Sequence, residues 1–144
     1  MTFGLNTCRE RDHMTEITVN MSFENSFRGS LSGQRGEVAI GSNDAGQMAP
    51  YELLLGALGA CYYSTFLGIA EKMKLQFERA EFTIHGVKRD EVPTTLREVN
   101  MLLTIHGAAD QKGFDRAASL AGKYCSIHAT LEKVAKMHTE LRFV

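Results

Sequence analysis

The chain has 144 residues, which is enough for one domain with a hydrophobic core and too few for two ordinary domains. Charged residues make up 23% of it and the formal net charge is -1, so no excess of positive charge attracts it to nucleic acid or to an anionic membrane. Polar residues interrupt every apolar run before it reaches the roughly 20 residues that span a bilayer. We therefore expect small-molecule or protein partners, with no nucleic acid and no membrane.

The first thirteen residues differ in character from the rest of the chain. They lack the apolar region of a secretory signal and end in a cluster of mixed charge, so we expect a cytoplasmic protein. We expect residues 1–13 to form a poorly ordered extension and residues 14–144 to form one domain. The three cysteines, Cys8, Cys61 and Cys125, are odd in number and widely spaced. Without an export signal, this favours reactive thiols over a structural disulfide framework.

Apolar residues alternate with polar ones from Ile17 to Phe23, which predicts a first strand. Glycines and turn-forming residues at positions 29–46 predict hairpins around a short apolar run. Pro50 then stands where a first helical residue belongs, and the long apolar segment after it has no further proline. This pattern predicts a helix from Pro50 to about Lys74.

The predicted helix is apolar around almost its whole circumference until Glu71, so we expect it to be buried on all sides. At about 1.5 Å per residue it is about 37 Å long, which is comparable to the diameter of a globule of this size. One subunit is too small to cover such a helix. We therefore expect a homodimer built around it.

The remainder of the chain predicts three more strands and two shorter helices. Alternation predicts strands at residues 80–84 and 99–105, paired antiparallel, and a final strand at 137–143. Asp110 can cap the first of the two shorter helices, and Gly122 can end it. The two helices together fill the connection to the last strand. The order of elements predicts an α+β fold.

A second short helix is expected directly after the first, with Ser126 as its N-cap. Cys125 then lies just before that cap. A helix N-terminus favours a thiolate, so local physics predicts that Cys125 is the more acidic thiol. Cys61, by contrast, has the apolar neighbours of an ordinary buried cysteine.

Two segments resemble the OsmC/Ohr family, which comprises osmotically inducible protein C and the organic hydroperoxide resistance proteins. The first-cysteine motif of that family, carried on a helix, is similar to PYELLLGALGAC at residues 50–61. The second cysteine follows 64 positions later in KYCSI, at residues 123–127, where the family has a cysteine that opens a helix. The resemblance covers roughly residues 14–144. It implies an intertwined α+β homodimer with antiparallel sheets around a long buried central helix.

The resemblance also implies an antioxidant stress-response protein that reduces organic hydroperoxides without a bound cofactor. Cys61 would attack the peroxide and become a sulfenic acid, and Cys125 would resolve it as a disulfide. A dithiol reductant such as dihydrolipoamide would restore the pair by exchange. The resemblance makes Cys61 the first thiolate, whereas the helix N-terminus favours Cys125 as the more acidic thiol. We follow the resemblance.

A thiolate in an apolar site needs a cation, and the family supplies an arginine from its N-terminal strands. Arg28 matches that position best and Arg35 is the reserve candidate, although a strand arginine in solvent is the plain alternative. In hydroperoxide resistance proteins a glutamate directly after the proline pairs with this arginine. Here that position is Tyr51, and the carboxylate follows at Glu52.

Glu52 lies nine residues before Cys61, which places the two on opposite sides of an ideal helix. Glu52 is equally explained as a first-turn residue that accepts backbone hydrogen bonds. The tyrosine substitution points to the less characterised OsmC-like branch of the family. It favours a different function, a non-catalytic binding protein for an apolar small ligand, and a redox sensor is a third possibility.

Cys125 and His128 have the C-x-x-H spacing of a metal-ligand pair. A structural zinc site usually has two such pairs, and the chain has one, so we expect no metal. No glycine-rich phosphate-binding motif is present, so we expect no nucleotide cofactor. Tyr62 and Tyr63 flank the first cysteine motif and fit either core packing or a hydrogen bond to the site.

Overall fold

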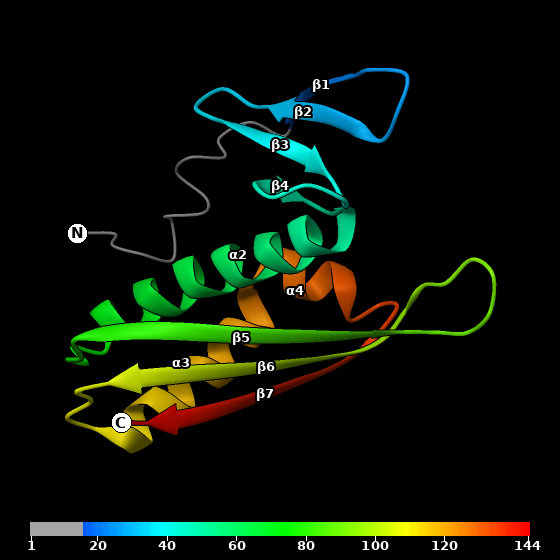
Figure 1. Cartoon of the computed structure of the whole chain (residues 1–144). Coiled ribbons are helices and arrows are strands. Elements are labelled where there is room, and N and C mark those ends of the chain that lie inside the picture. The colour runs from blue at the N-terminus through cyan, green and yellow to red at the C-terminus, as the bar shows by residue number, and fades with distance from the viewer. Residues whose placement is uncertain (1–15) are drawn as a thin grey trace.

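The computed structural model describes residues 16–144, so Cys8 and the predicted N-terminal extension lie outside the described residues. Figure 1 shows two sheets with a long helix between them, which confirms the predicted α+β class. The elements are, in chain order, β1 (Asn20–Phe23), β2 (Arg28–Ser32), β3 (Glu37–Gly41), β4 (Gln47–Met48), α2 (Pro50–Lys72), β5 (Arg79–Lys88), β6 (Leu96–His106), α3 (Gln111–Tyr124), α4 (Ser126–Leu131) and β7 (Lys136–Phe143).

The N-terminal sheet consists of β1 to β4 in sequence order. β1, β2 and β3 pair antiparallel, as the predicted hairpins require, and β4 pairs parallel to β3. Gly29 is needed here because a Cβ at that position would collide with the backbone oxygen of Ser22 on the neighbouring strand. The first strand begins at Asn20, later than predicted.

The second sheet has the order β5-β6-β7. β5 and β6 pair antiparallel, with Phe82 opposite Leu103, which confirms the predicted pair. β7 lies parallel to β6, with Leu141 opposite Leu103. A parallel neighbour requires a crossover connection, and α3 and α4 form it.

α2 runs from Pro50 to Lys72, close to the predicted bounds. Lys74, with a φ of 57°, takes the left-handed conformation that ends the helix. The face of α2 that contacts the rest of the domain carries the largest buried side chains, including Leu58, Tyr62 and Phe66, and it packs against α3, α4 and β5.

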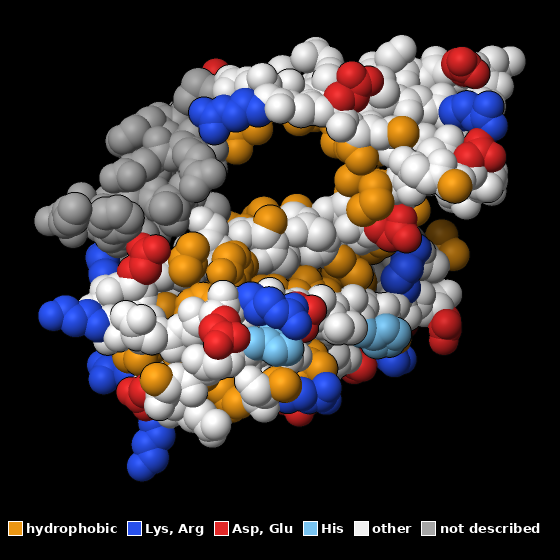
Figure 2. Space-filling view, turned by 60° about the vertical axis from the view of Figure 1, so that its left-hand side comes forward, with side chains coloured by type: hydrophobic (Ala, Val, Ile, Leu, Met, Phe, Trp, Pro, Cys, Tyr) orange, Lys and Arg blue, Asp and Glu red, His pale blue; other side chains and the backbone are white. Residues whose placement is uncertain are grey.

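Burial of α2 on all sides does not occur within one chain. Its opposite face is uncovered, since Gly56, Ala57 and Ala60 are exposed. This face looks toward the N-terminal sheet, and Figure 2 shows an opening between the two with hydrophobic side chains around it. The apolar residues of β1, Met21 and Phe23, are likewise exposed.

By length and composition alone, α2 is the one helix among residues 16–144 that could cross a membrane. The sequence-based statement that polar residues interrupt every apolar run is therefore too strict for this segment. Core helices of soluble proteins pass the same test, and 50% of the most apolar window of α2 is buried inside the protein.

The connection between α3 and α4 departs from the sequence prediction. Asp110 caps α3 as expected, because its Oδ1 accepts a hydrogen bond of 3.1 Å from the backbone N–H of Gly113. Gly122 does not end α3, which continues to Tyr124. The N-cap of α4 is Cys125 and not Ser126, because the Sγ of Cys125 accepts a hydrogen bond from the backbone N–H of His128.

Candidate functional site

Cys61 and Cys125 lie together in the core, although 64 residues separate them in the sequence. Cys61 lies in the middle of α2, and Cys125 occupies the junction of α3 and α4. Both are reduced thiols, with 6% and 0% of their surface exposed. The two side chains are within hydrogen-bonding reach of each other. The fold therefore assembles a buried pair of thiols, which is the central feature of the site.

Ser126 is a polar neighbour of Cys61. Its Oγ lies 3.8 Å from the Sγ of Cys61, and the residue itself is exposed. The short connection at Cys125 brings Ser126 there, since it is the first residue of α4. Its position beside Cys61 depends on the packing of α4 against α2, and no local pattern in the sequence indicates it.

Burial raises the pKa of the Cys125 thiol from 9.0 to about 12. The contact with Cys61 acts in the same direction, and the hydrogen bond from the His128 backbone N–H acts against it. The prediction that Cys125 is an acidic thiol is therefore wrong. α4 has only six residues, and the loss of hydration at a fully buried position outweighs the effect of its N-terminus. Cys125 keeps its proton at neutral pH and can donate it toward Cys61.

Tyr62 fixes α2 to α3 next to the thiols. Its hydroxyl donates a buried hydrogen bond of 2.7 Å to the backbone oxygen of Ala118. Burial raises its pKa to about 12, with a smaller contribution from Cys125 and an opposing one from a hydrogen bond with Thr139. Tyr62 is therefore a neutral residue packed in the core, and its hydroxyl donates to the backbone of Ala118.

Arg28 and Glu52 lie elsewhere within this chain. Arg28, in β2, forms an exposed ion pair with Asp44 in the loop between β3 and β4. Arg35 lies in the exposed turn between β2 and β3. The Oε2 of Glu52 accepts a 2.7 Å hydrogen bond from the backbone N–H of Ala49, which confirms its helix-capping explanation. Catalytic roles for Arg28 and Glu52 remain predictions.

Tyr51, which stands where the glutamate was expected, has its own partners. Its hydroxyl donates to the backbone oxygen of Thr94 over 3.4 Å. The ammonium of Lys88 lies 4.3 Å from the centre of its ring. The side chain thus connects the start of α2 to the loop between β5 and β6.

An apolar cavity of about 550 Å³ lies between α2 and β5. It is lined by Glu52, Leu55, Gly56, Gly59, Ala60, Tyr63, Ala80, Phe82 and Ile84. Gly59 makes the close contact possible, because a Cβ there would meet the Cδ1 of Ile84 at 2.8 Å. Glu52 is its single charged residue, so the cavity suits an apolar ligand.

Histidine, cysteine, aspartate and glutamate side chains do not gather into a group of three or more that could hold a metal ion within residues 16–144. Cys125 and His128, the C-x-x-H pair, instead share a backbone hydrogen bond at the start of α4.

Comparison with known proteins extends these observations. The model of the family described as "OsmC-like protein" matches residues 41–140, a segment that includes both cysteines. No curated protein matches the chain. An OsmC-like protein from Mycoplasma pneumoniae has a similar structure, with a TM-score of 0.81, 17% sequence identity, and coverage of 90% of this chain and 98% of that one.

Two further solved structures share the fold. A hypothetical protein from Aquifex aeolicus superposes with a TM-score of 0.79 at 22% identity, covering 91% of this chain and 99% of that one. An organic hydroperoxide resistance protein from Elizabethkingia anophelis gives a TM-score of 0.71 at 13% identity, covering 91% of this chain and 100% of that one. The family match spans more than half of the chain, and the structures agree with it in fold. The protein therefore belongs to the OsmC-like protein family.

Proposed function

We propose that this protein is a cytoplasmic, thiol-dependent peroxidase that reduces organic hydroperoxides. The observation that carries the proposal is the contact between Cys61 and Cys125 in the core. A structural role alone does not require two reduced thiols from distant parts of the sequence to meet. Solved members of the fold that are named organic hydroperoxide resistance proteins support the same chemistry.

The reaction begins at Cys61. Its thiolate attacks one peroxide oxygen, the O–O bond breaks, and the alkoxide takes a proton and leaves as an alcohol, so that Cys61 becomes a sulfenic acid. The sulfur of Cys125 then attacks the sulfur of Cys61, and water leaves as the disulfide forms. A dithiol such as dihydrolipoamide reduces the disulfide by exchange and is itself oxidised.

The surroundings of the thiols fit this sequence. Cys125 holds its proton, which suits a resolving thiol, and the first nucleophile is proposed to be Cys61. The Ser126 hydroxyl, 3.8 Å from the Cys61 sulfur, can hydrogen-bond to a thiolate or to a peroxide oxygen. The apolar residues around Cys61 favour an alkyl substituent over hydrogen peroxide.

The cation that the mechanism requires is proposed to come from a second subunit. Within one chain Arg28 of the N-terminal sheet pairs with Asp44, and the face of α2 opposite the core is uncovered. In a homodimer, the exposed apolar residues of β1 in one subunit are suited to cover the exposed small residues of α2 in the other. In that dimer Arg28 of the partner subunit would approach Cys61.

One observation favours a second candidate function. The apolar cavity between α2 and β5, together with Tyr51 in place of the expected glutamate, suits a non-catalytic protein that binds an apolar small ligand. The same thiol pair could also act as a redox sensor without efficient turnover.

Stopped-flow measurement of cumene hydroperoxide consumption, with dihydrolipoamide as reductant, separates these functions. Peroxidase activity predicts rapid turnover by the wild type and its loss in Cys61→Ser, while Cys8→Ser serves as the matched control and retains the rate. Consumption no faster than in Cys61→Ser would reject the peroxidase. In that case, binding of cumyl alcohol to the unreactive protein would support the binding function.

A further inference from the structure

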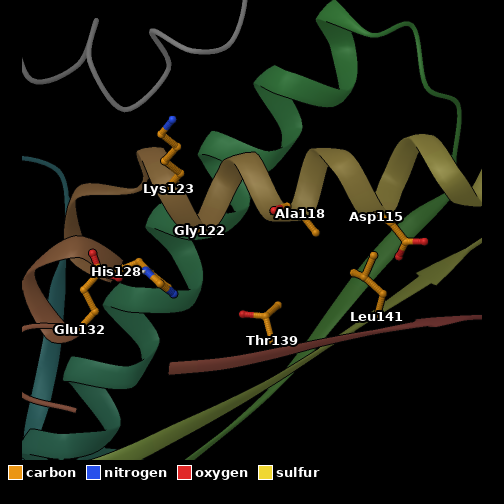
Figure 3. Close-up of a pocket in the computed structure, with 9 residues that line it drawn as sticks. Asp115, Ala118, Gly122, Lys123, His128, Glu132, Thr139 and Leu141 are labelled. Atoms are coloured by element: carbon orange, nitrogen blue, oxygen red, sulfur yellow. Dashed lines mark ion pairs between the residues drawn. The ribbon is translucent and has the colours of Figure 1, made fainter. Parts of the chain in front are cut away.

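A second cavity lies on the other side of Cys125, between α3, α4 and β7, and it has no part in the proposed thiol chemistry. Its volume is about 590 Å³. The lining residues are Asp115, Ala118, Ser119, Gly122, Lys123, His128, Glu132, Thr139 and Leu141. Figure 3 shows them from three elements around one space. Unlike the cavity beside α2, this one is lined mainly by polar and charged side chains.

The cavity is a groove along two turns of α3. Asp115, Ser119 and Gly122 follow one another at the spacing of a single helix face, and the rise from the first to the last is about 10 Å. Asp115 stands at one end, while His128 and Glu132 from α4 stand at the other (Figure 3). Between them lie Ala118 and Thr139, and the apolar Leu141 lies next to Asp115 (Figure 3).

The carboxylates at the two ends accept no hydrogen bond from a side chain within residues 16–144. Asp115 makes no hydrogen bond or ion pair with any residue in the range 16–144. The Oε2 of Glu132 lies 3.8 Å from the Nδ1 of His128, which is too long for a hydrogen bond. Lys123 extends away from Thr139 (Figure 3), and its ammonium lies 5.4 Å from the Tyr124 ring.

His128 gives the groove a buried polar group that points into it (Figure 3). Only 9% of its side chain is exposed, and its Nδ1 is fully buried without a hydrogen-bond partner among the described residues. Burial lowers the pKa of the imidazole, so the ring is neutral at physiological pH. The Glu132 carboxylate beside Nδ1 favours the tautomer that carries its proton there, which leaves Nε2 as an acceptor. Nε2 has no hydrogen-bond partner among the described residues, so a ligand in the groove can donate to it.

We propose that this groove binds a linear aliphatic diamine as a dication. One ammonium group donates to Glu132 and to the Nε2 of His128, and the other donates to Asp115. The methylene chain lies over Ala118 and Leu141. The two acidic ends and these apolar side chains select this class over a monoamine, which satisfies one end, and over an anion, which both carboxylates repel. The inference does not depend on peroxidase activity.

Isothermal titration of the reduced wild-type protein with 1,5-diaminopentane tests the proposal, with 1-aminopentane and 1,5-pentanediol as comparators. The diamine is expected to bind at least about fivefold more tightly than the monoamine, because each partly exposed ion pair contributes a modest factor of this size. The neutral diol is expected to show no saturable binding. Affinity should fall as salt is added, since both carboxylates are reached by solvent.

Matched variants locate the site. Asp115→Asn and Glu132→Gln should each reduce diamine affinity to about the level of the monoamine, whereas Glu140→Gln, the same loss of charge on an exposed residue of β7 outside the groove, should leave it unchanged. Ser119→Phe, at an exposed position of α3, should fill the groove and abolish binding while the protein stays folded by circular dichroism. Equal affinities for diamine and monoamine, or equal losses in Glu132→Gln and Glu140→Gln, would overturn the proposal.

Discussion

The backbone N–H of His128 donates a hydrogen bond of 3.4 Å to the Sγ of Cys125, and this contact makes the thiol the N-cap of α4. The backbone N–H of Cys125 in turn donates to Ala121 at the end of α3. One cysteine therefore ends one helix, begins the next and faces Cys61. Any change in the chemical state of Cys125 acts directly on the junction of the two helices.

The raised pKa of Cys125 predicts how stability depends on pH. The unfolded chain loses this proton near pH 9.0, whereas the folded protein keeps it until about pH 12. The contribution of the Cys125 thiol to the free energy of unfolding is complete below pH 9. It falls as the pH rises, because the unfolded state then binds fewer protons than the folded state. Between pH 8 and pH 10, the free energy of unfolding of the wild type should fall by about 1 kcal/mol more than that of Cys125→Ala. Urea unfolding under reducing conditions measures this difference, and equal pH dependence in the two proteins would contradict the raised pKa.

Tyr62→Phe should destabilise the fold by about 1 kcal/mol, because it removes a buried hydrogen bond to the carbonyl of Ala118. Urea unfolding at pH 7 gives this value. Tyr124→Phe is the control, since Tyr124 is 58% exposed, and its change in stability should be near zero. A similar effect of both substitutions would show that the Tyr62 hydrogen bond has no special role.

A brief pulse of organic hydroperoxide should link Cys61 to Cys125. Their contact in the core means that a bond can form with local movement only. Mass spectrometry of the digested protein should show the two peptides joined with the loss of two hydrogens, and Cys8 should remain outside the pair. Detection of Cys8 as the principal partner would refute the assignment of the redox pair.

The uncovered face of α2 predicts a dimer at micromolar concentration. Ala60→Glu should produce monomers or aggregates, because it places a charge on the exposed helix face that the second subunit is proposed to cover. Ala109→Glu, at an exposed position before α3, is the matched control and should remain dimeric. Light scattering decides between these outcomes, and a compact wild-type monomer would exclude the dimer.

Tyr51→Glu should restore the carboxylate that hydroperoxide resistance proteins place after the proline. If it positions Arg28 beside Cys61, a gain of about 1 to 2 kcal/mol in the transition state would raise the peroxidase rate about five- to thirtyfold. Lys88 lies against Tyr51 and would compete for the new charge, so the measurement is best made with and without Lys88→Met. Arg28→Ala should abolish the gain.

An unchanged rate in Tyr51→Glu would leave two explanations, which Glu52→Gln separates. Loss of activity in Glu52→Gln would mean that Glu52 already supplies the carboxylate. Absence of activity in every variant would support the binding function.

Local sequence patterns predicted the elements of the fold, because their causes are local. Alternation placed β5 and β6, Pro50 and the apolar run placed α2, and the Asp110 side chain was recognised as a cap. The two cysteine motifs likewise indicated the redox pair and the family. Each of these signals depends on residues within a few turns or strand positions of one another.

The properties of the site depended on packing between distant segments, which no local pattern encodes. The sequence alone favoured a lowered pKa for Cys125, but burial in the core raises that pKa. Cys125 also takes the N-cap position expected for Ser126. Ser126 reaches Cys61 only because α4 packs on α2. His128 was recognised by its spacing from Cys125 and considered only as a metal ligand, whereas the tertiary structure directs its ring into a groove formed with β7. The sequence by itself thus determined which helices and strands form and which two cysteines are candidates for the redox pair. Desolvation and long-range contacts, which exist only in the folded chain, decided the protonation of Cys125 and the neighbours that the two thiols meet.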